Sequence, residues 1–182
     1  VKDQLEIDDA RIKIIRQKKN LGPGISREKG RLAASGKYIN YLDSDDILHP
    51  EKIMRQVQLL EENPEIGMCY CTSRLFKDDP YQEKGDICAL SDRSFDTILP
   101  IILFQRPWST SSCLWSMEAV KKIGGWSPLW VGEDIEYEVR AGCLGIKTVH
   151  LPEVLSYYRQ NNDHKQLSHY STRRHIEGTN YK

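Results

Sequence analysis

Apolar and polar positions change period several times along the chain, which predicts strands and helices in turn. Runs rich in β-branched and aromatic residues predict strands at 11–15, 37–42, 66–76, 147–151 and 154–158. Helical spacing, together with helix-start and helix-stop residues, predicts helices at 24–34, 50–60, 96–104, 117–123 and 133–144. Such an alternation predicts a single α/β domain of three layers, with a sheet between two layers of helices.

The segments between and after these elements are more polar. In the helix that begins at Pro50, the spacing of Ile53, Val57 and Leu60 predicts the face that packs on the core. The stretch 77–93 is predicted to be a loop, and 160–182 a polar tail of the one domain 1–182.

Composition narrows the class of protein. Lys plus Arg and Asp plus Glu are both 26, so the basic excess of a general nucleic-acid binder is missing. No apolar run approaches the roughly 18 residues of a membrane span. The five cysteines form no CxxC pair, which favours a reduced, cytoplasmic protein with cysteines as small buried apolar groups over a zinc protein.

An acidic cluster, Asp43-Ser44-Asp45-Asp46, follows the predicted strand 37–42 directly. In α/β sheets, ligands bind at the carboxyl ends of strands. Three carboxylates in one turn repel one another, and a hard divalent cation such as Mg²⁺ or Mn²⁺ would offset this repulsion. The alternative is that these residues only turn the chain toward the next helix.

These residues and several others resemble the signature of family 2 glycosyltransferases. The similarity runs through Asn20-x-Gly22, Arg27, Gly30, Ala34-x-Gly36, Tyr38-Ile39 and Leu42-Asp43-Ser44-Asp45-Asp46, and continues in Gly124-Gly125-Trp126 and Gly132-Glu133-Asp134. The resemblance implies the GT-A fold, with a mixed, mostly parallel sheet, a DXD motif at Asp43–Asp45 and an ED motif at Glu133–Asp134. The strands that usually open this domain have no counterpart here, so we expect an N-terminally incomplete catalytic domain.

The resemblance also implies roles on the donor side of a site. Asp43, Asp45 and Asp46 would bind the nucleotide-sugar, with Arg27 near the donor phosphates. Asp45 and Asp43 would hold Mn²⁺ or Mg²⁺, with His164 as a third ligand. Glu28 departs from the family pattern, which commonly has Asn after this arginine.

On the acceptor side, Asp134 resembles the catalytic base of an inverting transferase. Burial and the neighbouring Glu133 should raise the proton affinity of Asp134. The alternative is an acidic pair that merely complements a helix N-terminus. Trp126 and Trp130 follow or flank these motifs and are candidates for the acceptor side of the site.

The resemblance implies an inverting, metal-assisted hexosyl- or N-acetylhexosaminyl-transferase whose donor is a nucleotide-sugar, most simply a UDP-sugar. The resemblance implies a glycan or lipid-linked acceptor in polysaccharide biosynthesis. It also implies a cytoplasmic protein and is compatible with peripheral association at the inner face of the membrane. The alternative is a non-catalytic module of the same fold that binds a nucleotide or glycan without turnover.

Overall fold

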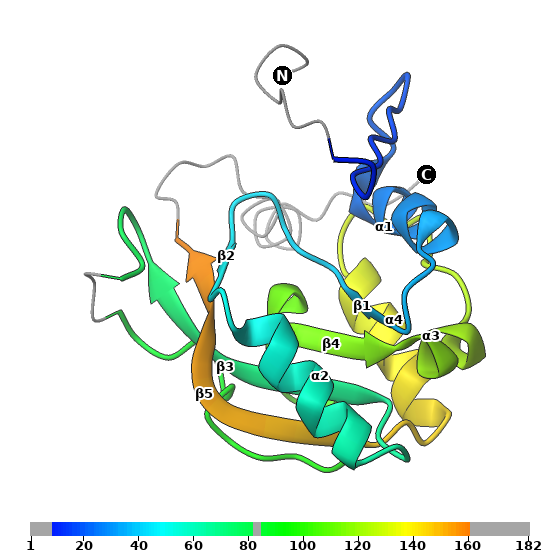
Figure 1. Cartoon of the computed structure of the whole chain (residues 1–182). Coiled ribbons are helices and arrows are strands. Elements are labelled where there is room, and N and C mark those ends of the chain that lie inside the picture. The colour runs from blue at the N-terminus through cyan, green and yellow to red at the C-terminus, as the bar shows by residue number, and fades with distance from the viewer. Residues whose placement is uncertain (1–8, 82–84, 161–182) are drawn as a thin grey trace, which may run out of the picture.

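The computed structural model describes residues 9–81 and 85–160, and shows a curved sheet with helices on both faces (Figure 1). The five strands are β1 (Tyr38–Asn40), β2 (Ile47–Leu48), β3 (Met68–Phe76), β4 (Cys113–Ser116) and β5 (Thr148–Arg159). The α-helices are α1 (Gly22–Ala33), α2 (Lys52–Glu62), α3 (Met117–Ile123) and α4 (Glu133–Cys143), and two 3₁₀ turns, η1 (Ile101–Leu103) and η2 (Thr110–Ser112), precede β4.

The order of strands across the sheet is β1-β4-β3-β5-β2. The sheet is mixed, as expected, but the expected parallel majority is wrong for the described strands. Only β3 and β5 pair in parallel, whereas β4 runs antiparallel to both of its neighbours and β2 runs antiparallel to β5. The reason is that β4 returns between β1 and β3, and β2 forms a short antiparallel edge beside β5.

Apolar side chains on the two faces of the sheet form two cores. Met68 and Tyr70 of β3 pack with α3 and α4, whereas Cys69 packs with Leu60 of α2. This alternation follows from the two-residue period of a strand, which sends successive side chains to opposite faces. The predicted three-layer architecture is therefore confirmed.

Helix α2 covers its face of the sheet with a partly polar stripe. The buried residues of α2 are Lys52, Gln56 and Leu60, while Ile53 is 40% exposed, so the predicted placement of Ile53 in the core is wrong. The Gln56 amide donates to the carbonyls of Cys69 and Ser112, at 3.1 and 2.9 Å. These two hydrogen bonds hold the buried Gln56 side chain, and with it the 52/56/60 face of α2, against the sheet.

Two predicted elements did not form as expected. Residues 12–17 have no regular structure and expose Ile12, Ile14 and Ile15, because a strand needs a partner and no described strand lies beside them. The predicted helix 96–104 is reduced to η1, since Pro100 lacks an N–H group and disfavours helical geometry in the residue before it. The two predicted strands 147–151 and 154–158 are one strand, β5, whose pairing with β3 is irregular near Thr72.

The carboxyl ends of β1, β3 and β5 lie at the same edge of the sheet, since the two antiparallel pairings through β4 leave these three strands pointing the same way. The loop after β1 crosses to β2 at the opposite side of the sheet and so passes over this edge. The acidic cluster therefore lies at the carboxyl ends of strands, as predicted. None of the described helices is long and apolar enough to cross a membrane, and the predicted tail lies almost wholly outside the described residues.

Candidate active site

The loop that carries the acidic cluster is held at both of its ends. The backbone N–H of Asp43 donates to the Ser111 hydroxyl at 3.2 Å, and the N–H of Asp46 donates to the carbonyl of Asp43 at 3.2 Å. At the end of β5, the N–H of Arg159 donates to Asp46 Oδ1 at 3.1 Å, and the Arg159 guanidinium donates to the carbonyl of Asp45 at 3.0 Å. The turn is thus fixed to η2 on one side and to β5 on the other.

Asp46 is the buried member of the cluster, with 8% of its surface exposed. Burial raises the pKa of Asp46 to about 6, and the negative charges of Asp43 and Asp45 add to this rise. One oxygen, Oδ2, is buried without a hydrogen-bond partner. Asp46 therefore anchors the loop from inside, while Asp43 and Asp45 are the carboxylates with access to solvent.

Arg27 joins the acidic loop to the second acidic motif. Its guanidinium donates to Asp43 Oδ1 at 2.6 Å and to Glu133 Oε1 at 2.5 Å, although Glu133 is 106 positions further along the chain. Burial opposes the charge of Arg27, but the two carboxylates outweigh it and raise the pKa of Arg27 above its ordinary value. Burial also raises the pKa of Glu133, with a further contribution from Asp134. The two motifs predicted from the sequence therefore meet in space.

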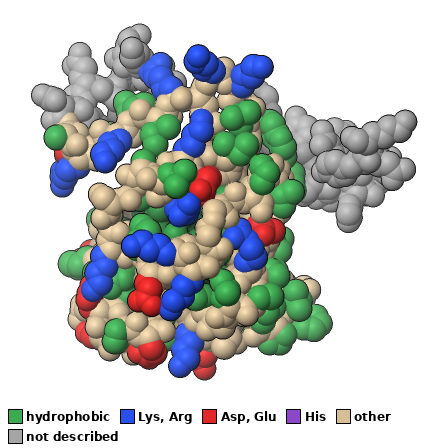
Figure 2. All heavy atoms as spheres, turned by 90° about the vertical axis from the view of Figure 1, so that its right-hand side faces the viewer, with side chains coloured by type: hydrophobic (Ala, Val, Ile, Leu, Met, Phe, Trp, Pro, Cys, Tyr) green, Lys and Arg blue, Asp and Glu red, His purple; other side chains and the backbone are tan. Residues whose placement is uncertain are grey.

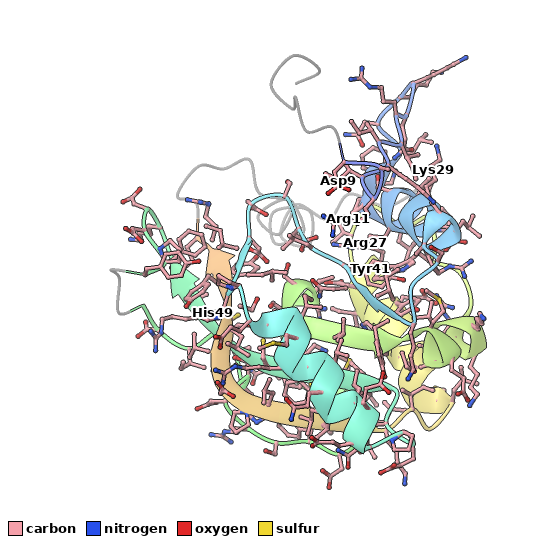
Figure 3. All side chains as sticks on the ribbon, viewed as in Figure 1. Asp9, Arg11, Arg27, Lys29, Tyr41 and His49 are labelled. Atoms are coloured by element: carbon pink, nitrogen blue, oxygen red, sulfur yellow. The ribbon has the colours of Figure 1, made fainter. Side chains whose placement is uncertain are left out.

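The packing of α1 places Arg27 between these carboxylates, and Figure 3 shows it extending from α1 toward the segment with Tyr41. Gly24 lets the helix approach closely, since a Cβ atom there would lie 2.1 Å from the Ser127 carbonyl oxygen. Glu28, the residue that departs from the family pattern, accepts the N–H of Trp126 at 3.0 Å and pairs with Arg31. Glu28 therefore attaches α1 to the segment before α4.

Asp134 begins α4 beside Glu133 but is held by a different arginine. Arg106 donates to Asp134 Oδ2 at 2.7 Å, and to both oxygens of Glu138 at 2.9 and 2.6 Å. Burial alone would raise the pKa of Asp134, but the guanidinium of Arg106, backbone N–H groups at the start of α4 and Arg27 together outweigh it and lower this pKa below its ordinary value. The prediction that burial and Glu133 would raise the proton affinity of Asp134 is therefore wrong, because the contact with Arg106 depends on the tertiary fold.

The two tryptophans have different environments. Trp126 is 7% exposed, stacks on Tyr137 with ring centroids 4.2 Å apart, and lies under the Arg27 guanidinium. Its ring is therefore part of the aromatic core and offers little surface to a ligand, and its place on the acceptor side stays a prediction. Trp130 is half exposed and covers Gly22, where a Cβ atom would lie 3.3 Å from the indole ring. Trp130 alone of the two keeps a face for a ligand.

A cleft of about 430 Å³ lies beside Arg27 and Asp43, between α1 and the segment that follows β1. It is lined by Pro23, Ser26, Arg27, Gly30, Ala34, Ile39, Asn40, Tyr41, Leu42, Asp43 and Ser44. On the α1 side of the cleft, Gly30 and Ala34 have small side chains that leave space for a ligand. Arg27 and Asp43, which pair with each other, also line the cleft.

The surface around α1 is basic even though the whole chain has a net charge of zero. Between residues 10 and 37 the only acidic residue is Glu28, and Figure 2 shows Lys and Arg side chains gathered over the upper part of this face. The basic residues of this range are Arg11, Lys13, Arg16, Lys18, Lys19, Arg27, Lys29, Arg31 and Lys37. Such a concentration of one sign of charge favours an anionic ligand.

The acidic loop fits a divalent cation in part. Its donors are hard carboxylate oxygens, and Mg²⁺ is commonly held by one or two carboxylates together with substrate phosphates and water. Within 9–81 and 85–160, however, no three His, Cys, Asp or Glu side chains are grouped to hold a metal by themselves. His164, the predicted third ligand, lies outside the described residues. Among the described residues, the carboxylates of the acidic loop could therefore hold a cation only together with further ligands.

Sequence reasoning missed four polar residues of this region: Arg106, Ser111, Glu138 and Arg159. One signal was available, since Asp134 and Glu138 are four residues apart on one helix face, where a nearby cation would offset the repulsion between two like charges. Nothing local indicates that this cation is Arg106, which reaches α4 from the loop between η1 and η2. The contacts of Ser111 and Arg159 likewise depend on the tertiary fold.

Comparison with known proteins identifies the family. The profile of the family described as "Glycosyl transferase family 2" matches residues 1–119. The Amylovoran biosynthesis glycosyltransferase AmsE of Erwinia amylovora is 25% identical over 82% of this chain and 55% of its own length. The uncharacterized glycosyltransferase MJ1057 of Methanocaldococcus jannaschii is 42% identical over 34% of this chain and 21% of its own length.

Among solved structures, S. aureus TarS 1-349 in complex with UDP-GlcNAc superimposes with a TM-score of 0.63 at 17% identity, over 85% of this chain and 46% of that one. The chain thus spans about half or less of the length of these relatives. It belongs to glycosyltransferase family 2, as its motifs predicted. The structural similarity confirms the GT-A-type α/β fold.

Proposed function

We propose that this chain is the catalytic part of a metal-assisted, inverting glycosyltransferase that uses a UDP-sugar. The observation that carries the proposal is the Arg27 bridge, which brings Asp43 of one motif and Glu133 of the other to within hydrogen-bond distance of the same guanidinium. Two acidic motifs that are far apart in the sequence can act in one site only if the fold brings them together.

On the donor side, a nucleoside diphosphate would enter the cleft beside Arg27 and Asp43. The basic surface around α1 would attract it, and the Arg27 guanidinium would pair with a phosphate oxygen in the fork geometry that suits phosphates. Asp45 and Asp43 would hold Mn²⁺ or Mg²⁺, and this cation would neutralise the negative charge of the departing diphosphate. UDP-GlcNAc and UDP bound to the structural relative TarS support a uridine nucleotide as the donor to test first.

On the acceptor side, Asp134 would take the proton of the attacking hydroxyl group. The lowered pKa keeps this carboxylate ionised at neutral pH and so ready to accept a proton, although a stronger base would accept it more readily. The oxygen that loses its proton attacks the anomeric carbon while the bond to the diphosphate breaks. Attack from the face opposite the leaving group inverts the configuration at that carbon.

The acceptor is proposed to be a glycan or a lipid-linked sugar in polysaccharide biosynthesis, at the cytoplasmic side of a membrane. The names of two relatives support this class: AmsE, and the succinoglycan biosynthesis protein ExoO of Rhizobium meliloti, which is 40% identical over 29% of this chain. The exposed ring of Trp130 is the candidate for contact with this acceptor. Transfer of a hexosyl or an N-acetylhexosaminyl group fits equally.

The alternative is a module that binds a nucleotide without turnover. The accessible and ionised Asp134 favours the enzyme, because a binding module has no use for a base on the acceptor side. Nucleotide binding that persists without any transfer would favour the module instead.

Calorimetric titration of UDP, with and without Mn²⁺, tests the donor half of the proposal. We expect Mn²⁺-dependent binding that Asp45→Ala abolishes. Asp96→Ala is the matched control, since Asp96 is an exposed aspartate whose backbone carbonyl accepts the N–H of Thr148 at the opposite end of β5. Binding that ignores both Mn²⁺ and Asp45 would contradict the proposed donor site.

A further inference from the structure

Arg106 is the centre of a second ion-pair cluster that the donor chemistry does not use. It comes from the loop between η1 and η2 and reaches two carboxylates one helical turn apart on α4, Asp134 and Glu138. The Arg106 side chain is 19% exposed and that of Glu138 only 4%, whereas Asp134 keeps 22% of its side-chain surface in solvent. The cluster is thus buried at one end and open at the end that carries Asp134.

The geometry of the contacts differs between the two carboxylates. Glu138 receives two parallel hydrogen bonds from Arg106, through Nε and Nη2, which is the bidentate arrangement that fixes the orientation of a guanidinium. Asp134 receives a single bond to Oδ2 from Nη1, at 2.7 Å. Thr110 also accepts a hydrogen bond from Nη2, at 3.1 Å. Glu138 and Thr110 therefore anchor the guanidinium, and its remaining arm holds Asp134.

We propose that Arg106 is the positioning residue for the Asp134 carboxylate, held in place by Glu138, so that Asp134 presents a fixed and ionised oxygen pair to the acceptor. This inference rests on the proposed role of Asp134 as the base. Arg106 itself touches no substrate in this account and acts only through Asp134.

Several charged groups besides Arg106 face Asp134. Arg27 of α1 also favours the ionised carboxylate, and the N–H of Ile135 donates to Asp134 Oδ1 at 2.9 Å. Glu133 and Glu138 on the same helix oppose it, and Thr110 contributes a hydroxyl group 3.5 Å from Oδ2. Among these groups Arg106 makes the strongest favourable contribution, which opposes the effect of burial and lowers the pKa of Asp134.

The test uses a variant that removes the whole buried pair, Arg106→Met with Glu138→Leu. Replacing both charges by apolar side chains avoids leaving Glu138 buried and unpaired, which Arg106→Ala would do. Glu138→Gln keeps Arg106 and is the matched comparison, while Arg106→Lys keeps a positive charge without the fork. Glu136→Gln serves as a control on another face of α4, where Glu136 pairs with Arg140.

The first readout is the titration of the Asp134 carboxyl carbon by NMR, assigned by its loss in Asp134→Asn. We expect the midpoint to rise by about one to three pH units in the double variant, and by less in Arg106→Lys. Glu138→Gln should not raise it, because the Arg106 contact remains and the opposing charge of Glu138 is removed. An unchanged midpoint in a folded double variant would overturn the proposal.

The second readout is the pH profile of kcat for transfer from UDP-GlcNAc. The acid limb should move to higher pH by the same amount as the titration, with little change in KM for the donor. A loss that is uniform across pH would mean a purely structural role and would also overturn the proposal. If the wild-type protein shows no transfer at all, the proposed function fails, and the carbon titration still decides whether Arg106 controls Asp134.

Discussion

Arg27 and Arg106 each hold two carboxylates, but they join different parts of the molecule. Arg27 makes one hydrogen bond to each of two separate segments, and the Asp43 side chain is 35% exposed. Arg106 makes a bidentate pair with a carboxylate that is almost fully buried, and both of its acidic partners belong to α4. Arg27 could therefore exchange the more exposed Asp43 for a ligand while it stays paired with Glu133, whereas the loss of Arg106 would leave Glu138 unpaired in the core.

The contact between Arg27 and Asp43 is thus one that a ligand could replace, whereas the contact between Arg106 and Glu138 is permanent. Arg27 and Asp43 both line the cleft, and in the proposed function an incoming phosphate would replace Asp43 and leave that carboxylate to a metal ion. Arg106 cannot exchange the buried Glu138 in this way. It fixes Asp134, which remains accessible to solvent.

The largest effect is expected from Asp134→Asn, on the Arg106 side. Asparagine keeps an oxygen for Arg106 but cannot accept a proton, so transfer should fall by about 10²–10⁴-fold. Binding of UDP should be unchanged, because Asp134 does not line the cleft. Turnover by UDP release and calorimetry of UDP together measure this difference, with Glu136→Gln as the control. Loss of UDP binding in Asp134→Asn would contradict the separation of the two clusters.

A smaller effect, on the binding of UDP, is expected from Arg27→Met. A charge-assisted hydrogen bond contributes about 1.5–3 kcal/mol, so loss of the guanidinium should weaken UDP binding about 10-fold or more. Arg31→Met is the matched control on the same helix, since Arg31 pairs only locally with Glu28. Equal weakening in both variants would mean that the charge of the surface matters and the bridge does not.

The smallest effect concerns how α1 holds Arg27 in place. Gly24→Ala should lower the free energy of unfolding by about 1–3 kcal/mol, because the added methyl group would press on the Ser127 carbonyl. Gly30→Ala, on the same helix with nothing within 4 Å, should instead raise it by up to about 1 kcal/mol. Urea unfolding measures both, and equal effects would show that the close approach of α1 is not required.

The sequence predicted those parts of the site that depend on local pattern. Asp43 follows a strand and Asp134 begins a helix, and both placements depend only on neighbouring residues. The placement of Asp43 at the carboxyl ends of strands followed from the α/β architecture, whereas nothing local placed Asp134 there. The family resemblance added the expectation that they belong to one site.

The parts that could not be predicted depend on contacts between distant segments. Arg106 lies beside Pro107 in a loop without periodicity, and its partners on α4 are about 30 residues away. Because this contact was unknown, the predicted direction of the Asp134 pKa was wrong. The predicted strand 11–15 did not form for a related reason. Its apolar pattern is typical of a strand, but a strand also needs a neighbouring strand to pair with, and the local sequence does not supply one.

The most direct test of the central claim is whether one bound metal ion lies close to both acidic motifs. Mn²⁺ added with UDP broadens the NMR signals of nearby residues, so we would follow the amide signals of Asp43, Glu133, Asp134 and Asp96. We expect the first three signals to broaden together and that of Asp96 to stay sharp, with the effect lost in Asp45→Ala. Broadening confined to Asp43, with Glu133 and Asp134 unaffected, would contradict a single site built from the two motifs.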